Sequence, residues 1–151
     1  MTRVFASIEE VRQAVGQDIG PSSWRHISQA DVNTFADLTG DHQWIHVDAV
    51  RAAQSRFGAT IAHGYLTLAL IPAFNLELVE FRFGGARLNY GLNRVRFPTP
   101  VRVGEHLRAS TQIVGVDAAA AGEQVTLRWT LTTENATRPA CVAESVVLVT
   151  P

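Results

Sequence analysis

The chain has 151 residues, the length of a single domain, and 46% of them are hydrophobic while 18% are charged. This balance excludes an intrinsically disordered chain, because disorder requires low hydrophobicity together with high net charge. The formal net charge of -1 excludes an overall electrostatic attraction to nucleic acid or to an anionic membrane surface.

The cysteine content and the N-terminal residues indicate a cytoplasmic protein. Cys141 is the single cysteine, so no intrachain disulfide can form, which is typical of a reducing compartment. The first ten residues lack the apolar core of a signal peptide. The longest apolar run, at about residues 65–74, is shorter than the roughly 20 residues that span a membrane. We therefore expect one cytoplasmic domain over residues 1–151, without membrane or nucleic-acid partners.

Helical patterns occupy the first half of the chain, from about residue 5 to residue 80. The segment Ser7–Glu10 has the form of a capping box and predicts a helix from Ser7 to about Gly16. A second helix is expected from Ser28 to a stop at Gly40. Asp48 can cap a short third helix over about residues 49–54.

A fourth helix is expected to begin near His63 and Gly64. It is apolar nearly all round through Ile71, which predicts a buried central helix. Pro72 would bend it or restart it. The polar residues Asn75 and Glu77 indicate that its far end reaches water.

Strand patterns occupy the second half of the chain. They cover residues 87–97, 107–116, 124–133 and 140–149, with turns at 117–122 and 134–139. Helices followed by strands, rather than alternating with them, predict an α+β fold. We expect an antiparallel sheet curved around one buried helix.

The densest polar cluster follows the predicted helix stop at Gly40. Asp41 and His46 are five residues apart, so they would point in different directions on a helix and need a loop to meet. A carboxylate beside an imidazole can hold one water molecule and move its protons, which is the minimum for general acid–base catalysis. The alternative is a surface turn in which Asp41 binds only backbone donors.

Gly64 is the second candidate, at the predicted start of the central helix. A helix N-terminus offers free N–H groups, so the Gly64 amide could bind a carbonyl oxygen that gains charge during a reaction. The alternative is that His63 is an ordinary helix cap and that Gly64 is a packing site between helix and sheet.

Polar side chains also follow the first long predicted strand. Arg94 and Arg96 could bind phosphates, and Asn89 or Asn93 could bind amides. The alternative, to which we give equal weight, is that alternating arginines form the solvated face of a strand.

Other chemistries have weaker support in the sequence. His42, His46 and His63 with Asp41 suggest a metal site, but their spacing matches no strong zinc pattern, and we expect no metal. Cys141 lies in the middle of a predicted strand and is better explained as a small core residue than as a nucleophile.

Taken together, these segments resemble the MaoC-like enoyl-CoA hydratases of the hot-dog superfamily. The resemblance covers about residues 24–149, and it is closest to the mycobacterial-type single-domain (R)-specific hydratases. It depends on the joint pattern of residues 35–41, His46 five residues later, and Ala62-His63-Gly64 at the start of the central helix.

The resemblance implies a curved antiparallel sheet wrapped around a long helix, and a homodimer with its sheets joined at their edges. It implies reversible addition of water to a trans-2-enoyl-CoA, giving an (R)-3-hydroxyacyl-CoA. Asp41 and His46 would then bind the catalytic water, with Asp41 as the principal base, and the Gly64 amide would bind the thioester oxygen. No cofactor is required, because coenzyme A is part of the substrate.

This chain departs from the family motif in the loop. The common motif reads Gly-Asp-x-Asn-Pro-(Leu/Ile)-His, whereas here Gln43 and Trp44 replace the Asn and the Pro. Gln43 can keep an amide at that position. Trp44 removes the fixed backbone angle of proline, which affects the loop conformation and the pocket width.

We further expect the substrate to contact residues around the central helix. The acyl chain should lie near Tyr65, Leu66 and Phe57, with His63, Gln43 and Asn89 as further binding residues. Arg94 and Arg96 are the candidates for the coenzyme A phosphates. Two alternatives are a hot-dog thioesterase, which would need a carboxylate on the central helix, and a non-catalytic acyl-CoA-binding module or heterodimer subunit.

Overall fold

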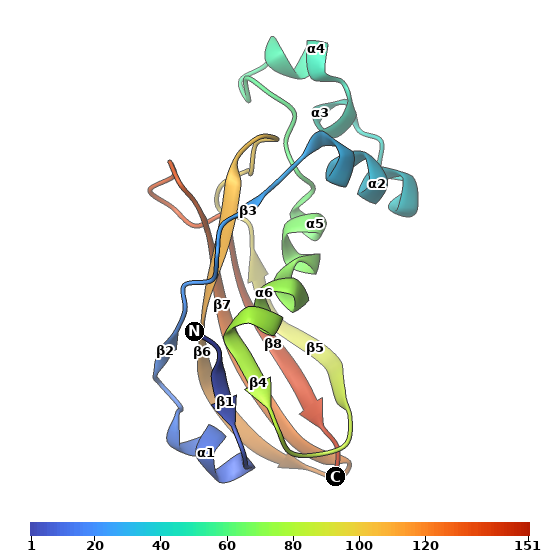
Figure 1. Ribbon diagram of the computed structural model, residues 1–151. Coiled ribbons are helices and arrows are strands. Elements are labelled where there is room, and N and C mark those ends of the chain that lie inside the picture. Colours follow the sequence, from blue (N-terminus) through green and yellow to red (C-terminus); the bar gives the residue numbers. More distant parts are fainter.

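The computed structural model describes residues Met1–Pro151 and contains a six-stranded, antiparallel curved sheet with a helix on its concave side (Figure 1). The sheet order is β2-β6-β7-β8-β5, and β3 also pairs with β6. The strands are β2 (Asp18–Ile19), β3 (Arg25–His26), β5 (Arg87–Arg96), β6 (His106–Ala119), β7 (Gly122–Thr133) and β8 (Cys141–Val149). The α+β architecture expected from the sequence is confirmed.

The four long predicted strands are present, and the hairpin between β6 and β7 is tighter than predicted. Buried and half-buried residues alternate along these two strands, because one face of the sheet covers the core. The ladder continues to the Ala119–Gly122 pair, so only Ala120 and Ala121 form the turn instead of residues 117–122. Gly122 has a φ of 144°, a conformation that favours glycine at this position.

Four short strands in or near the first half of the chain were not predicted. β1 (Arg3–Phe5) pairs in parallel with β4 (Val79–Phe81), and β2 and β3 add short pieces beside β6. Each has only two or three residues, which is too short to show an alternating pattern.

The predicted caps define the helices of the first half. They are α1 (Ile8–Gln13), α2 (Gln29–Thr39) and α4 (Ala49–Ala53), and their N-caps are Ser7, Ser28 and Asp48. Gly40 ends α2 with a φ of 79°. A one-turn helix, α3 (Trp44–Val47), lies inside the segment that was predicted as a loop. None of the helices combines the length and the apolarity that a membrane crossing would require.

The central helix consists of two pieces, α5 (Gly64–Ala69) and α6 (Ile71–Leu78), with the break just before Pro72 as predicted. The prediction that this helix is buried on all sides, however, was wrong. One face packs into the core, whereas Tyr65 is 73% exposed and Leu76 is 82% exposed on the other. A helix on one side of a sheet buries only the face toward the sheet, and in this single chain nothing covers the opposite face.

The core lies between the concave face of the sheet and the helices. Trp129, Phe5 and Phe74 are its largest fully buried side chains. Cys141 is fully buried in it, and burial raises the pKa of the Cys141 thiol to about 11. A thiol with such a pKa is a poor nucleophile at neutral pH, so Cys141 is a core residue, as expected.

Candidate active site

Asp41 and His46 are placed by the sharp end of α2 and the short helix that follows it. The left-handed Gly40 turns the chain, and the Asp41 Oδ1 atom accepts a 3.3 Å hydrogen bond from the Gln43 amide. The α3 helix then begins and directs the His46 ring inward. The helical turn therefore supplies the direction change that the sequence argument had assigned to a loop.

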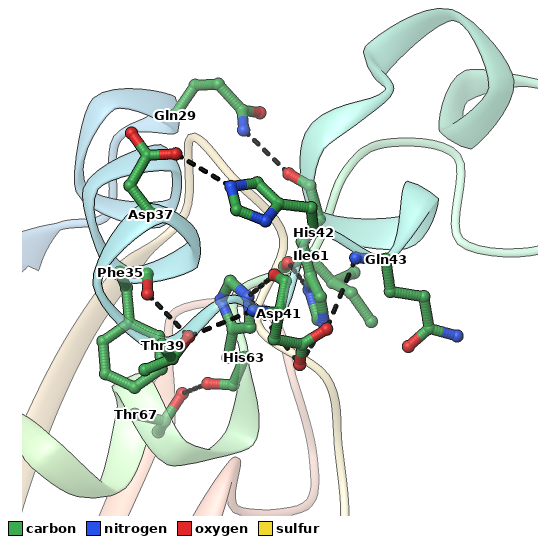
Figure 2. Close-up of polar contacts among 11 residues, drawn as sticks. Gln29, Phe35, Asp37, Thr39, Asp41, His42, Gln43, Ile61, His63 and Thr67 are labelled. Atoms are coloured by element: carbon green, nitrogen blue, oxygen red, sulfur yellow. Dashed lines mark hydrogen bonds and ion pairs between the residues drawn. The ribbon is translucent and has the colours of Figure 1, made fainter.

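The Asp41 carboxylate faces two histidine rings (Figure 2). Its Oδ2 atom lies 4.0 Å from the Nε2 atom of His46 and 4.0 Å from the Nε2 atom of His63. The Asp41 side chain is 53% exposed, whereas those of His46 and His63 are 7% and 3% exposed. The cluster is therefore open to solvent on its carboxylate side and closed behind its rings.

The hydrogen bond to Ile61 decides which nitrogen of His46 carries the proton. The Nδ1 atom of His46 lies 2.6 Å from the carbonyl oxygen of Ile61, which can only accept, so Nδ1 carries the hydrogen. In the neutral ring, the Nε2 lone pair then faces Asp41. Burial lowers the pKa of His46, and the nearby His63 contributes to this, while the Ile61 bond and the Asp41 charge oppose it.

His63 supports the cluster from behind. Its Nε2 atom donates to the backbone carbonyl of Asp41 at 2.9 Å, and its ring stacks on His46 with centroids 3.7 Å apart and 22° between the planes. The Phe35 ring lies against its edge, at a centroid distance of 5.0 Å. His63 is the N-cap residue of α5, but its side chain makes no cap bond to the helix and contacts the cluster instead.

The arrangement of lone pairs suits a water molecule better than a metal ion. One ligand atom each from Asp41, His46 and His63 lie within 4.8 Å of one another, as a metal site would require. However, the Nε2 atom of His63 is used as a donor to Asp41, and its Nδ1 atom is buried without a partner.

Gly64 follows His63 directly and is the first residue of α5. Its amide has no acceptor within the helix, because the first N–H groups of a helix point out of its end. A Cβ atom at this position would lie 2.9 Å from the Phe97 ring, so the backbone and the ring are in close contact. Gly64 is thus a packing site, and its amide remains free to bind a ligand.

The other predicted binding residues lie outside this cluster. The Gln43 side chain is exposed and points away from Asp41 in Figure 2. Tyr65 is exposed, and Leu66 is buried in the core. Phe57 follows α4 and lies under the Arg56 guanidinium, 4.9 Å from the ring centroid.

The polar residues of β5 are all exposed, and none contacts Asp41 or His46. Arg94 pairs in register with Glu144 of the neighbouring strand, and Arg96 bonds to the carbonyl of Val95. Arg96 directly precedes Phe97, the residue whose ring contacts Gly64 at the start of α5. Asn89 lines a different feature, the groove described next.

An apolar groove of about 700 Å³ lies between the exposed side of α5–α6 and strands β5, β7 and β8. It begins at Leu68, one helical turn after Gly64, and extends along α6 to Phe81. Its lining includes Pro72, Leu76 and Trp129, whereas Asp41, His46 and His63 are not part of it. The groove therefore begins one helical turn from Gly64 and continues along the helix away from it.

Three contributions to the site were missed in the sequence. They are the Phe35 ring against His63, the Ile61 carbonyl that accepts a hydrogen bond from His46 Nδ1, and the Phe97 ring against Gly64. Phe35 stood within the family pattern but had been assigned to the helix face. A backbone carbonyl leaves no side-chain signal, so the Ile61 contribution could be found only from coordinates.

Comparison with known proteins identifies the family. The MaoC-like domain family matches residues 10–135. The chain is 49% identical over 146 residues to 3-hydroxyacyl-thioester dehydratase Z of Mycobacterium tuberculosis, covering 96% of this chain and 97% of that protein.

Solved structures show the same fold. A monoamine oxidase regulatory protein from Archaeoglobus superimposes with a TM-score of 0.79 at 25% identity, covering 99% of this chain and 97% of that one. The R-hydratase PhaJ1 of Pseudomonas aeruginosa has a TM-score of 0.71 at 26% identity, covering 90% and 81%. The expected hot-dog fold is thereby confirmed. The chain belongs to the MaoC-like dehydratase family, and it is an enzyme of the hydro-lyase class.

Proposed function

We propose that this protein catalyses the reversible addition of water to trans-2-enoyl-CoA thioesters, giving (R)-3-hydroxyacyl-CoA. The observation that carries the proposal is the 4.0 Å separation of the Asp41 Oδ2 and His46 Nε2 atoms, next to the free amide at the start of α5. Two atoms 4.0 Å apart can each lie about 2.8 Å from one water molecule, which is a normal hydrogen-bond distance.

Both groups accept hydrogen bonds, so a water molecule between them donates one hydrogen to each. Burial disfavours the imidazolium form of His46, which leaves the Asp41 carboxylate as the principal base. The water O–H bond breaks toward Asp41 while the oxygen bonds to C3 of the substrate. The electron pair of the C2–C3 double bond moves to the thioester oxygen, and the proton on Asp41 then transfers to C2.

The Gly64 amide stabilises the charge that develops on the thioester oxygen. Its N–H is unpaired within α5 and is fixed by the backbone, so it needs no reorganisation during the reaction. Loss of one donor of this kind typically raises a barrier by roughly 3–4 kcal/mol. The conjugated thioester accepts the electrons itself, so the proposed reaction requires no metal or redox cofactor.

We assign the acyl chain to the apolar groove along α5–α6 rather than to Tyr65, Leu66 and Phe57. The groove begins one turn after Gly64, and its walls are mainly aliphatic and aromatic. Arg96, beside Phe97 near the start of α5, is the better candidate for a coenzyme A phosphate, and Arg94 is the second.

A second copy of the chain is the proposed partner. β5 is an edge strand on which Leu88 and Tyr90 are exposed outside the groove, and Tyr65 is a further exposed apolar side chain on α5. Pairing of two β5 edges would satisfy the free backbone groups and cover this surface. A dimer mass for the purified chain in size-exclusion chromatography with light scattering is expected, and a monomer would support the heterodimer alternative.

The purified chain should hydrate crotonyl-CoA, which is followed by loss of the absorbance of the conjugated thioester. Chiral chromatography of the released 3-hydroxy acid should give the R isomer. Release of free thiol from saturated acyl-CoA without hydration would instead support the thioesterase alternative. Against that alternative, Glu77, the acidic residue of α6, lies far from Gly64 and is bound by Ser23 at 2.6 Å and 3.0 Å.

A further inference from the structure

The side chain of Gln29, the first residue of α2, connects three segments around His46. Its Nε2 atom donates to the backbone carbonyl of His46 at 2.8 Å (Figure 2). The same atom donates to the Asn33 side chain at 2.9 Å. Its Oε1 atom accepts a 2.5 Å bond from the Thr60 hydroxyl. Because the His46 carbonyl can only accept, these partners define which end of the Gln29 amide is nitrogen.

The His46 backbone needs support from outside its own helix. α3 has only four residues, and its N-cap Gln43 makes no side-chain cap bond. A helix of one turn has little stability of its own, and the carbonyls at its end lack partners within it. The Gln29 amide supplies such a partner at the residue that carries the ring.

Thr60 and Ile61, the segment that binds the His46 ring, are themselves held by backbone hydrogen bonds on both sides. The Ile61 carbonyl accepts the ring proton, and the Ile61 amide donates to Ile45 at 2.9 Å. The Thr60 carbonyl accepts from the Val103 amide at 2.8 Å. The Thr60 side chain is buried, and its hydroxyl lies on the same segment, one residue before Ile61. Gln29 therefore joins the backbone of His46 to the segment that binds its ring.

We propose that Gln29 and Thr60 are positioning residues for His46, which hold its ring in the Nδ1–H form with Nε2 facing Asp41. This inference rests on the proposed hydratase reaction. Neither side chain touches the space beside Asp41, so both act through the orientation of His46. Misplacement of a catalytic group by about 1 Å can reduce the rate by a factor on the order of 10².

The test compares Thr60→Val with Thr60→Ser. Valine keeps the shape of threonine but loses the hydroxyl, whereas serine keeps the hydroxyl. We expect Thr60→Val to lower kcat for crotonyl-CoA by about ten- to a hundredfold with KM changed less than twofold, and Thr60→Ser to recover most of the loss. Gln29→Glu, which cannot donate to the His46 carbonyl, should lower kcat similarly.

Two variants serve as matched controls. Thr111→Val removes another buried hydroxyl, which bonds to the Arg128 carbonyl within the sheet at 3.1 Å. Asn33→Ala removes the other partner of the Gln29 amide, on the exposed side of α2. Both control variants should keep the parent kcat. A fall in kcat that occurs only in the Gln29 and Thr60 variants therefore shows a positioning role and not a general loss of stability.

The second readout does not depend on activity. Nitrogen chemical shifts of the His46 imidazole should show the Nδ1–H tautomer in the parent and in Thr60→Ser, and a mixture of tautomers in Thr60→Val. If the parent chain does not hydrate crotonyl-CoA, the proposed reaction is wrong, while the imidazole spectra still decide the positioning role. Unchanged spectra and an unchanged kcat in Thr60→Val would overturn the inference.

Discussion

Replacement of Asp41 by asparagine tests the proposed base with little disturbance of the fold. The Asp41 side chain is half exposed, and its hydrogen bond to the Gln43 amide is 3.3 Å long. Asparagine has the same shape and can accept the same bond through its oxygen. We therefore expect the free energy of unfolding to change by less than about 0.5 kcal/mol.

The effect on catalysis should be much larger than the effect on stability. An asparagine amide cannot take a proton from water, and loss of a positioned base typically costs a factor of about 10² to 10⁴ in rate. His46 and the Gly64 amide remain in place in the variant, so substrate binding should change little. We expect kcat for crotonyl-CoA to fall by at least about 10², with KM within about threefold of the parent value.

The assay is the initial rate of crotonyl-CoA hydration, measured beside thermal unfolding of the same preparations. Asp117→Asn is the matched control, because it removes one negative charge from an exposed aspartate of β6, away from the site. A parental rate for Asp41→Asn would refute the assignment of Asp41 as the base. Unfolding of Asp41→Asn at a much lower temperature would instead support a structural turn.

Three further predictions concern the other groups of the site. His46→Gln should reduce hydration of crotonyl-CoA by at least about 10² in kcat, and a parental rate would exclude His46 from holding the water. Burial lowers the pKa of His46 in the folded chain. As the pH falls below about 6.5, this imidazole is therefore protonated in the unfolded chain before it is protonated in the folded chain. The stability contributed by neutral His46 is therefore present above that pH and lost as the pH falls through its folded pKa. The free energy of unfolding, measured by urea titration at several pH values, should fall less steeply with acid in His46→Gln than in the parent. Gly64→Ala keeps the backbone N–H but adds a Cβ atom that must displace the adjacent Phe97 ring, and it should lower kcat/KM at least about tenfold; an unchanged kcat/KM would argue against binding of the thioester oxygen at this amide.

The sequence was informative wherever a signal is local. Ser28 and Gly40 bound α2 as predicted, because capping and left-handed turns depend on residues within about four positions of each other. The Asp41 and His46 pair was likewise found from one short segment, and the structure brings the two side chains together. The four long strands were visible because the buried face of a sheet imposes a period of two.

Contacts between distant segments could not be predicted from local sequence patterns. The stack of His63 on His46, the bond from His46 to the Ile61 carbonyl and the link from Gln29 to Thr60 join residues 15 to 31 positions apart. None of these contacts has a periodicity, and one partner is a backbone carbonyl. The protonated nitrogen of His46 is set by one of them, so its chemistry could not be assigned before the fold was known.

The exposure of the central helix shows the same difference between what local sequence patterns predict and what tertiary packing decides. Apolar residues nearly all round the helix through Ile71 indicated that this part of it should be covered, and that composition is a property of the sequence alone. The tertiary structure decided which face packs on the sheet and which face lines the groove. The sequence by itself therefore determined the elements and the reactive side chains, because these depend on neighbouring residues. Only the tertiary structure decided their orientation, because packing acts between segments that the chain sequence separates.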